Sequence, residues 1–342
     1  MPRNDPCQWV SPVTDTLGRP LRDLRISVVD ACNFRCTYCM PKAEGKARSH
    51  TRRDERLSVA EIATLGVGFA AAGVRKIRLT GGEPLLRQDL PEIVSCLESI
   101  QGIDEVALTT NGALLVQRAA SLRRAGLTRV TVSLDTLDPA QFRAITGVDQ
   151  LHRVIDGIAA ANAAGFHRVK VNCVVRRGVN EDQVLPLARA FRGSGNIVRF
   201  IEFMDVGTCN GWSRDQVVES STIRELIHRS YPLVPVAPEL PGEVAERYRY
   251  QDGNGEIGFI SSISRPFCGD CSRARVTCDG QLFTCLFSSA GTPIRTAVRA
   301  GPAAVEKRVR EIWSGRADRY SELRHHGRQR SSRRLEMFVI GG

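Results

Sequence analysis

The chain has 342 residues, 48 Lys+Arg against 37 Asp+Glu for a formal charge of +11, and eleven cysteines. A hydrophobic share of 42% is enough for a large core, which excludes wholesale disorder, and 30 glycines and 16 prolines exclude collagen-like and linker-like chains. The longest apolar run, 65–74, is too short to cross a bilayer, and the N-terminus lacks an apolar signal segment, so we expect a cytoplasmic protein with no membrane partner.

Short β-branched segments alternate with helix-like segments through the first two thirds of the chain. Ser58 with Glu61 forms a capping-box pattern at the start of the first helix, and Gly73, Gly126 and Gly165 stand where helices end before the next strand. Strands are expected at 24–29, 76–80, 105–110, 129–134, 168–175 and 198–203, and helices at 58–72, 89–100, 113–125, 151–164 and 180–191.

Strands that alternate with helices pair in parallel through right-handed crossovers. The sequence therefore predicts an α/β protein whose main domain is an incomplete, about six-unit β/α barrel, with a doubly wound sheet as the second choice. The rhythm fades near residue 230, where the proline-rich stretch 231–242 is typical of a boundary loop, and 246–250 and 256–260 form a hairpin pattern beyond it. We expect a barrel domain at 1–235 and a smaller C-terminal domain at 236–342.

The strongest signal follows the first strand, where Cys32, Cys36 and Cys39 are spaced C-x3-C-x2-C. Loops at the C-terminal ends of barrel strands carry the chemistry of such folds. Three thiolates can hold three irons of a [4Fe–4S] cluster and leave the fourth iron open, whereas structural zinc needs four ligands. Buried free thiols are the other alternative, and three of them within eight residues make it the weaker one.

A second group of cysteines, Cys268, Cys271 and Cys285, has the spacing C-x2-C-x13-C. It again offers three ligands, which predicts a second cluster in the C-terminal domain, although Cys278 lies inside the span and could complete a zinc site. If the residues after Cys271 form a strand, Arg273 and Arg275 share one face and could bind phosphates.

The first cysteine motif, with Tyr38 before its last cysteine, resembles the radical S-adenosylmethionine superfamily. The resemblance implies that Cys32, Cys36 and Cys39 hold a [4Fe–4S] cluster whose open iron chelates the methionine part of S-adenosylmethionine. Thr80-Gly81-Gly82-Glu83-Pro84 matches the superfamily's motif for the methionine amino group, and the Glu83 carboxylate can pair with an ammonium. The implied contacts to S-adenosylmethionine are Tyr38, Gly82, Ser133 and Met204.

Over residues 15–342 the pattern resembles, more narrowly, the family of radical enzymes that cyclise GTP in molybdenum cofactor biosynthesis. The motifs 78–87, 108–112 and 199–205, the second cysteine group and the terminal Gly341-Gly342 carry this resemblance. It implies two [4Fe–4S] clusters, the second on Cys268, Cys271 and Cys285, and a C-terminus that reaches the active site. The implied GTP contacts are Arg25, Arg78, Thr109, Lys170, Arg273, Ala274 and Arg275.

The resemblance also implies the reaction and the partners. A 5′-deoxyadenosyl radical takes hydrogen from the ribose C3′ of GTP, and the C3′ radical attacks guanine C8 to give (8S)-3′,8-cyclo-7,8-dihydroguanosine 5′-triphosphate. A one-electron reductant, a homodimeric assembly and a downstream cyclic pyranopterin monophosphate synthase are the implied partners.

Two alternatives compete with this interpretation. One is a radical enzyme that modifies peptides, although such enzymes commonly carry seven C-terminal cysteines against four beyond residue 210 here. The other is a basic zinc protein that binds nucleic acid, which would leave the β/α units and the Gly-Gly-Glu-Pro motif without a role. The arginine-rich stretch 307–334, with ten Lys/Arg against three acids, receives no role, and Cys7, Cys96, Cys173, Cys209 and Cys278 are interpreted as ordinary thiols.

Overall fold

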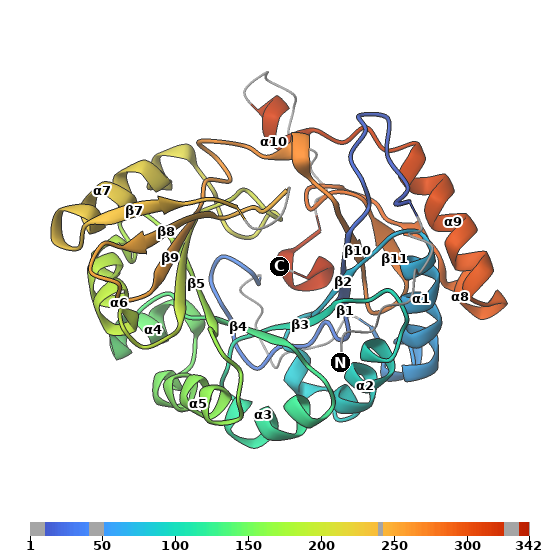
Figure 1. The fold of residues 1–342 in the computed structure, drawn as a ribbon, viewed down its shortest axis with the longest axis horizontal. Coiled ribbons are helices and arrows are strands. Elements are labelled where there is room, and N and C mark those ends of the chain that lie inside the picture. Colours follow the sequence, from blue (N-terminus) through green and yellow to red (C-terminus); the bar gives the residue numbers. More distant parts are fainter. Residues whose placement is uncertain (1–10, 41–50, 239–241, 325–334, 342) are drawn as a thin grey trace.

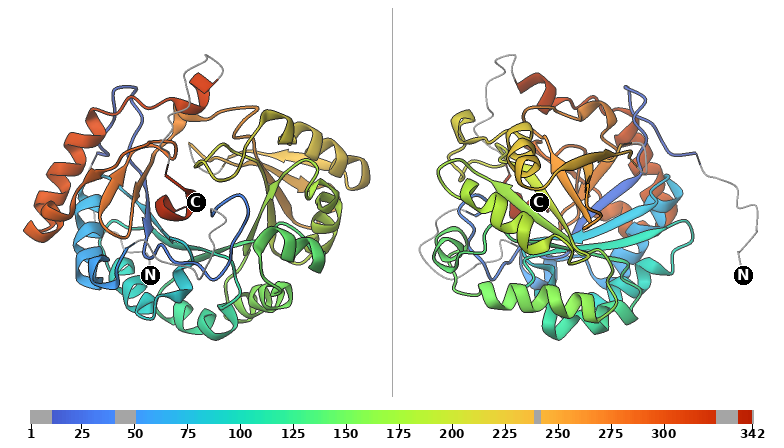
Figure 2. Two further views of the ribbon diagram at one scale, coloured as in Figure 1. Left: turned by 180° about the vertical axis from the view of Figure 1, so that it is seen from behind. Right: turned by 60° about the vertical axis from the view of Figure 1, so that its left-hand side comes forward.

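The computed structural model of the chain describes residues 11–40, 51–238, 242–324 and 335–341. Its described strands form one twelve-stranded sheet in the order β12-β11-β10-β1-β2-β3-β4-β5-β6-β9-β8-β7. The sheet is curved, with helices on its outer side and the C-terminal helix on its inner side (Figures 1 and 2).

The N-terminal half builds the centre of the sheet. Its six strands pair in parallel in the order of the sequence, as predicted. They are β1 (Asp23–Ser27), β2 (Lys76–Thr80), β3 (Glu105–Thr110), β4 (Arg129–Ser133), β5 (Lys170–Val175) and β6 (Ile197–Glu202). The helices between them are α1 (Val59–Ala71), α2 (Leu90–Glu98), α3 (Leu115–Arg124), α4 (Pro139–Thr146), α5 (Leu151–Ala163) and α6 (Val184–Phe191).

Local sequence signals explain where these elements begin and end. Ser58 caps α1 in a reciprocal capping box with Glu61, as expected. Gly73, Gly126 and Gly165 all have positive φ, the conformation that ends each helix and turns the chain toward the next strand. Helix α4 was not predicted, although Asp138 at its N-cap and Pro139 at its first position are a recognisable start signal.

The C-terminal part of the chain extends the same sheet at both edges. Strand β9 (Glu256–Ile260) pairs in parallel with β6, and β10 (Arg273–Val276) pairs in parallel with β1. Strands β8 (Glu246–Tyr250) and β9 form the predicted hairpin, and β11 (Gln281–Phe283) and β12 (Thr292–Pro293) follow β10 in antiparallel order. The barrel-like region thus holds two parallel strands beyond the predicted six. The boundary at 235/236 falls within one sheet and, as a division into domains, stays a prediction.

The proline-rich stretch at 231–242 is not wholly a loop. Residues Leu233–Val236 form β7, which pairs with β8 and lies last in the order of strands. Proline has no backbone N–H to donate. Pro235 is tolerated in β7 because an edge strand has a neighbour on one side only. Helices that the sequence analysis did not assign are α7 (Ser220–Ser230), α8 (Arg295–Ala300), α9 (Pro302–Ser314), α10 (Tyr320–Leu323) and α11 (Met337–Ile340).

Alternation along the strands separates a packed outer face from a polar inner face. Leu24, Ile26, Ile77 and Leu79 are fully buried in the main core, which lies between the sheet and its helices. Their neighbours in sequence point to the inner face and are polar, and of these Arg25 and Arg78 are half-buried whereas Ser27 and Thr80 are buried. We call this inner side of the sheet the lumen. None of the described helices is both long enough and apolar enough to span a membrane.

Candidate active site

The first cysteine group lies in a loop that is held at both ends. Strand β1 leads directly into it, and the backbone N–H groups of Arg35 and Thr37 donate to carbonyls at the end of α4. Within the loop, the N–H of Cys39 donates to the carbonyl of Cys36 at 3.0 Å. Cys32, Cys36 and Cys39 are free and half-buried. The loop therefore presents three unpaired thiols at the C-terminal end of the first strand, as predicted.

Burial is the main influence on these thiols. It raises the pKa of Cys32 to about 11, with the Glu83 carboxylate adding to the effect. Burial and the neighbouring cysteines also raise the pKa values of Cys36 and Cys39. Cys36 and Cys39 thus lie within electrostatic reach of Cys32. Metal binding there would have to displace their protons.

The two glycines after β2 allow one backbone segment to approach another. A Cβ on Gly81 would lie 2.1 Å from the carbonyl oxygen of Val29, and one on Gly82 would lie 2.2 Å from that of Ala31. Hydrogen bonds from Gly82 N and Glu83 N to those same carbonyls hold the segments together. The close approach is therefore to the chain just before Cys32, and a contact of Gly82 with S-adenosylmethionine stays a prediction.

The Glu83 carboxylate is used by the fold itself, and its expected pairing with an ammonium stays a prediction. It is buried and accepts hydrogen bonds from Thr110 Oγ1 at 2.7 Å, Asn111 N at 2.7 Å and Leu85 N at 3.0 Å. Burial raises its pKa to about 7. The same Asn111 donates to Asn33 Oδ1 and faces the Cys32 sulfur at 3.8 Å. Glu83 thus connects the ends of β2 and β3 behind the cysteine loop.

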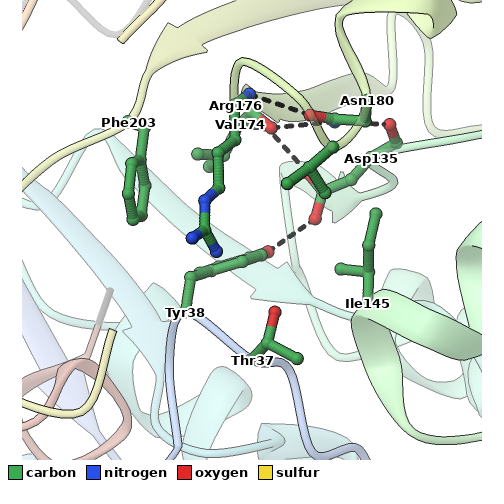
Figure 3. A pocket seen from close by; sticks show the side chains of 9 residues that line it. Thr37, Tyr38, Asp135, Ile145, Val174, Arg176, Asn180 and Phe203 are labelled. Carbon is green, nitrogen blue, oxygen red and sulfur yellow. Dashed lines mark hydrogen bonds between the residues drawn. The ribbon is translucent and has the colours of Figure 1, made fainter. Parts of the chain in front are cut away.

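Tyr38 lines a small pocket behind the same loop (Figure 3). Its hydroxyl donates to Asp135 Oδ2 at 2.7 Å, and the N–H of Val174 donates to the other oxygen at 2.8 Å. The Arg176 guanidinium lies 5.1 Å from the centre of the Phe203 ring, on the side toward Tyr38. Burial raises the pKa of Asp135 to about 6. Asp135 was not predicted, although it directly follows the strand that was expected at 129–134.

The other two predicted contacts to S-adenosylmethionine also lie at strand ends. Ser133 is the last residue of β4 and is paired with Asn172 of β5. Met204 follows β6 and packs against a small cluster that includes Val206 and Ile340. Their positions are compatible with the predicted roles, which stay predictions.

The second cysteine group surrounds the start of β10. Cys268 begins a short 3-10 helix (Cys268–Asp270), Cys271 follows it, and Cys285 lies just beyond β11. Arg273 donates to the Cys271 sulfur at 3.6 Å. Although burial opposes ionisation, Arg273 and Arg316 lower the pKa of Cys271 to about 6. Burial raises that of Cys285 to about 11, and Cys271 and Cys268 add to it.

Cys278 lies apart from that group. Its thiol is buried and donates to Thr51 Oγ1 at 3.4 Å, and its carbonyl accepts from Leu57 N. It is therefore placed as an ordinary core thiol, as the sequence analysis expected, and not as a fourth ligand. Cys7 lies outside the described residues.

The donor chemistry of both groups suits iron–sulfur clusters. Each offers three free, half-buried thiols, and thiolates are the ligands that such clusters use. In the part of the chain that the structure describes, no three His, Cys, Asp or Glu side chains converge closely enough for a single metal ion. Cluster binding is accordingly taken up below as a proposal.

Between the cysteine groups, cationic side chains line the lumen. Arg275, Arg25 and Arg78 occupy neighbouring register positions on β10, β1 and β2. Arg78 Nη1 donates to Thr109 Oγ1 at 3.1 Å and to Thr131 Oγ1 at 3.3 Å, which carries the polar row across β3 and β4. Predicted residues from four strands are thus brought together.

The row continues on β5 and β6. Thr131 is paired with Lys170, and the Arg199 Nε atom donates to Asn172 Oδ1 at 2.9 Å. Burial, followed by repulsion from Arg199 and other cations, lowers the pKa of Lys170 to about 7. Burial and Arg78 lower that of Arg199 to about 9. Burial and, after it, the neighbouring cations therefore both oppose the charged forms of Lys170 and Arg199.

Two details differ from the sequence analysis. Ala274 was grouped with Arg273 and Arg275, but its side chain is fully buried in the core on the other face of β10, so only its backbone could serve a ligand. Arg199 was quoted in a motif and received no role. The alternation of β6, with Val198 and Phe200 buried on either side of a half-buried arginine, is the signal that could have found it.

The C-terminal tail lies in the lumen, as predicted (Figure 1). Ser27 Oγ donates to the carbonyl of Val339 at 3.1 Å, and Arg275 Nη1 donates to the carbonyl of Gly341. The N–H of Phe338 faces the Cys39 sulfur. Gly341 has a φ of 70°. Gly342 lies outside the described residues.

Strand direction places the two cysteine groups at opposite ends of the lumen. The first group follows the C-terminal end of β1, whereas Cys271 precedes the N-terminal end of β10, which runs parallel to β1. Five residues of strand at about 3.3 Å each separate the ends by roughly 16 Å. The cationic row, which consists of Arg25, Arg78, Lys170, Arg199 and Arg275, lies between them.

Comparisons with known proteins agree with this arrangement. The profile of the Radical SAM superfamily matches residues 26–191, and that of Molybdenum Cofactor Synthesis C matches residues 196–322. The crystal structure of Streptococcus suis SuiB bound to S-adenosylmethionine superposes with a TM-score of 0.60 at 15% identity, over 92% of this chain and 69% of that one, which shows a shared fold. The fold and the cysteine loop after β1 thus define a radical S-adenosylmethionine enzyme.

Close relatives define the family further. A GTP 3′,8-cyclase of Xanthomonas axonopodis pv. citri is 54% identical over 97% of this chain and 99% of its own length. One of Acidothermus cellulolyticus is 51% identical over 92% of this chain and 89% of its own, and one of Staphylococcus saprophyticus is 42% identical over 97% and 100%. The chain belongs to the GTP 3′,8-cyclase family, whose members are radical lyases of molybdenum cofactor biosynthesis.

Proposed function

We propose that the protein binds GTP in the lumen and cyclises it to (8S)-3′,8-cyclo-7,8-dihydroguanosine 5′-triphosphate with S-adenosylmethionine as co-substrate. The observation that carries the proposal is the cationic row of Arg25, Arg78, Lys170, Arg199 and Arg275 between two groups of three free cysteines. A triphosphate of about four negative charges would neutralise this excess positive charge.

The first cysteine group would hold a [4Fe–4S] cluster with one open iron. When bound, that cluster supplies the electron that splits S-adenosylmethionine into methionine and a 5′-deoxyadenosyl radical. Tyr38, Gly82, Ser133 and Met204 would orient the co-substrate at the strand ends. Their task is to bring its 5′ carbon to the ribose of GTP in the orientation for hydrogen transfer.

The cyclisation consists of one hydrogen transfer, the formation of one carbon–carbon bond and the addition of one electron and one proton. The 5′-deoxyadenosyl radical takes the C3′ hydrogen and becomes 5′-deoxyadenosine. The C3′ radical then forms a bond to C8 of guanine, which leaves an unpaired electron on N7. One electron from an external reductant and one proton complete the dihydro product.

The chain's own contribution to this chemistry is positioning and protection. Arg25, Arg78, Arg273 and Arg275 would hold the phosphates by charge-assisted hydrogen bonds, and Lys170 and Arg199 would complete the charge balance. Thr109 lies beside Arg78 and would offer its hydroxyl. The tail from Met337 to Gly341 covers the lumen near the first cysteine group, where it would exclude water from the radical.

The second cysteine group would hold a further [4Fe–4S] cluster that meets the guanine end of GTP with its open iron. The lowered pKa of Cys271 supports this proposal, because a thiolate is the form that binds iron. A one-electron reductant, a homodimer and a downstream synthase that consumes the product complete the proposal.

The test is anaerobic turnover of the iron-reconstituted, dithionite-reduced protein with S-adenosylmethionine. We expect GTP to accelerate the formation of 5′-deoxyadenosine at least tenfold and to yield a product that has the same mass as GTP but elutes separately from it. ATP is the matched control, since it carries the same triphosphate and lacks the guanine. If 5′-deoxyadenosine forms no faster with GTP than with ATP, the proposal fails.

A further inference from the structure

The described part of the arginine-rich stretch encloses the second cysteine group. Arg316 follows α9, and its side chain donates to the carbonyl of Cys271, two residues before β10. Arg316 as a whole is 4% exposed, and its guanidinium lies 4.4 Å from the centre of the Trp313 ring. This arginine is therefore not part of a solvated surface.

A buried carboxylate holds two arginines together at this place. Asp15 Oδ2 accepts from Arg19 Nε at 2.6 Å and from Arg316 Nη1 at 3.2 Å. Both pairs are almost fully removed from solvent, with side-chain exposures of 2% or less. Arg316 Nε also lies 3.5 Å from Asp318 Oδ2, so the two guanidiniums face two carboxylates. Asp15 is fully buried, whereas the Asp318 side chain is 32% exposed. Breaking such a buried group of ion pairs by removing one partner is costly.

Both arginines also donate hydrogen bonds to the backbone of the cysteine ligands. Arg19 Nη1 donates to the carbonyl of Cys268 at 2.7 Å, and Arg316 Nη1 donates to the carbonyl of Cys271 at 2.7 Å. Arg19 Nη1 also reaches the carbonyl of Asp318 at 2.7 Å. The two ligand-bearing peptides are thus fixed from outside by one rigid, charged unit.

The segment around residues 318–322 adds further ties. Glu322 Oε1 accepts from the N–H of Gly269 at 2.9 Å, between the first two cysteines. Thr284, the neighbour of Cys285, donates to Asp318 Oδ2. Each of the three cysteines is therefore held through its backbone or a direct neighbour by residues 316–322.

We propose that Arg19 and Arg316, locked by Asp15, are positioning residues for the second cluster: they orient the peptides of Cys268 and Cys271 and place the buried Arg316 guanidinium beside the ligands, which sets the cluster's reduction potential. The inference rests on the proposed function, because it requires that cluster. Three thiolates give a [4Fe–4S] core a net negative charge, which the Arg316 guanidinium would stabilise. Net charge and hydrogen bonds near the cysteines are what tune such potentials.

The experiment is a potentiometric titration of the holoenzyme followed by electron paramagnetic resonance. S-adenosylmethionine is added in parallel samples to identify the first cluster's signal, which then serves as an internal reference. We compare the native protein with Arg316→Gln, which removes the charge, and with Arg316→Lys, which keeps it. Arg308→Gln is the matched control, since Arg308 is a surface arginine on α9 paired with Glu311.

In Arg316→Gln we expect a more negative potential for the second cluster only, with the first cluster unchanged. Arg316→Lys is expected to keep the native potential but to broaden the second signal, because a lysine cannot hold Asp15 and the Cys271 carbonyl in the same fixed geometry. Arg308→Gln is expected to match the native protein in both the potential and the line shape of the second cluster.

Unchanged potential and line shape of the second cluster in Arg316→Gln would overturn the inference and leave the proposed function intact. If Arg316→Gln does not fold, Arg316→Lys decides. A second-cluster signal in Arg316→Lys that is identical to the native signal would also overturn the inference. A native protein that binds only about four irons would instead remove the second cluster from the proposed function, and this inference with it.

Discussion

Arg275 on β10 donates a hydrogen bond to the main-chain carbonyl of Gly341, one residue before the end of the chain. A side chain assigned to the phosphates of GTP is thus held by the protein's own tail. The tail and the cationic row are therefore coupled, and the position of the tail should affect how the lumen receives its ligand.

Gly341 tests this coupling. Its φ of 70° disfavours a side chain, and a Cβ would lie 2.4 Å from Thr80 Cγ2. We expect Gly341→Ala to destabilise the docked tail by about 1–2 kcal/mol from the backbone conformation alone, with the clash in addition. Amide exchange of residues 335–341 should rise and turnover should fall. Gly178→Ala is the control, since Gly178 has a φ of 72° and no atom within 4 Å of its would-be Cβ. Equal effects of both substitutions would argue against a specific role of the docked tail.

Lys170 predicts a pH dependence of GTP binding. Its pKa in the free protein is lowered to about 7, so near pH 8.5 most of the side chain is neutral. A bound triphosphate favours the charged form and raises the pKa, so binding takes up a proton. Affinity should therefore fall between pH 7 and 8.5, at the limit by roughly tenfold per pH unit. Calorimetry in buffers of different ionisation enthalpy measures the proton uptake. Lys170→Arg should flatten the profile, and a flat profile in the native protein would contradict the assignment.

Two cysteines close to β11 have different predicted roles: Cys285 as a cluster ligand and Cys278 as a core thiol. Cys285 faces Cys271 and Cys268, whereas Cys278 is buried against Thr51. We expect Cys285→Ala to lose roughly half of the iron of the reconstituted protein, because one of two clusters loses a ligand. Cys278→Ala should keep its iron. Iron and sulfide analysis decides, and the reverse result would show that the wrong cysteine was assigned.

Glu336 anchors the tail to the loop after β6. Its carboxylate accepts from Thr208 N at 2.9 Å and Thr208 Oγ1 at 2.8 Å, and the Cys209 thiol donates to it at 2.9 Å. Burial and this carboxylate raise the pKa of Cys209 to about 12. In Glu336→Ala we expect Cys209 to react several times faster with iodoacetamide, because more of it is thiolate. The half-buried Cys96 is the internal control, and an unchanged Cys209 rate would show that the anchor does not control this thiol.

Patterns that depend on local sequence were predictable. The strand and helix alternation, the cap at Ser58 and the cysteine spacing all act over a few residues, and each is found where it was expected. The cationic row was predicted only in part. Thr109 and Lys170 came from the family resemblance. The alternation of β6 could have placed Arg199 on the inner face, but that it lies beside Asn172 of β5 is seen only in the sheet.

Long-range pairing was not predictable from one sequence. That β9 and β10 join opposite edges of the barrel sheet depends on contacts between residues far apart in the chain. Likewise, Asp15 and Arg316 are separated by 301 positions, and nothing near either residue announces the other. Arg316 received no role because its partners are a carboxylate far away in the chain, Asp15, and the backbone carbonyl of Cys271, which carries no sequence signal.

Transfer of the C3′ hydrogen is the most direct test of the central claim that GTP in the lumen meets a radical formed at the first cysteine group. Anaerobic turnover with GTP deuterated at C3′ should place one deuterium in 5′-deoxyadenosine, measured by mass spectrometry, whereas GTP deuterated at C2′ should place none. 5′-Deoxyadenosine free of deuterium from the C3′-labelled substrate would contradict the account.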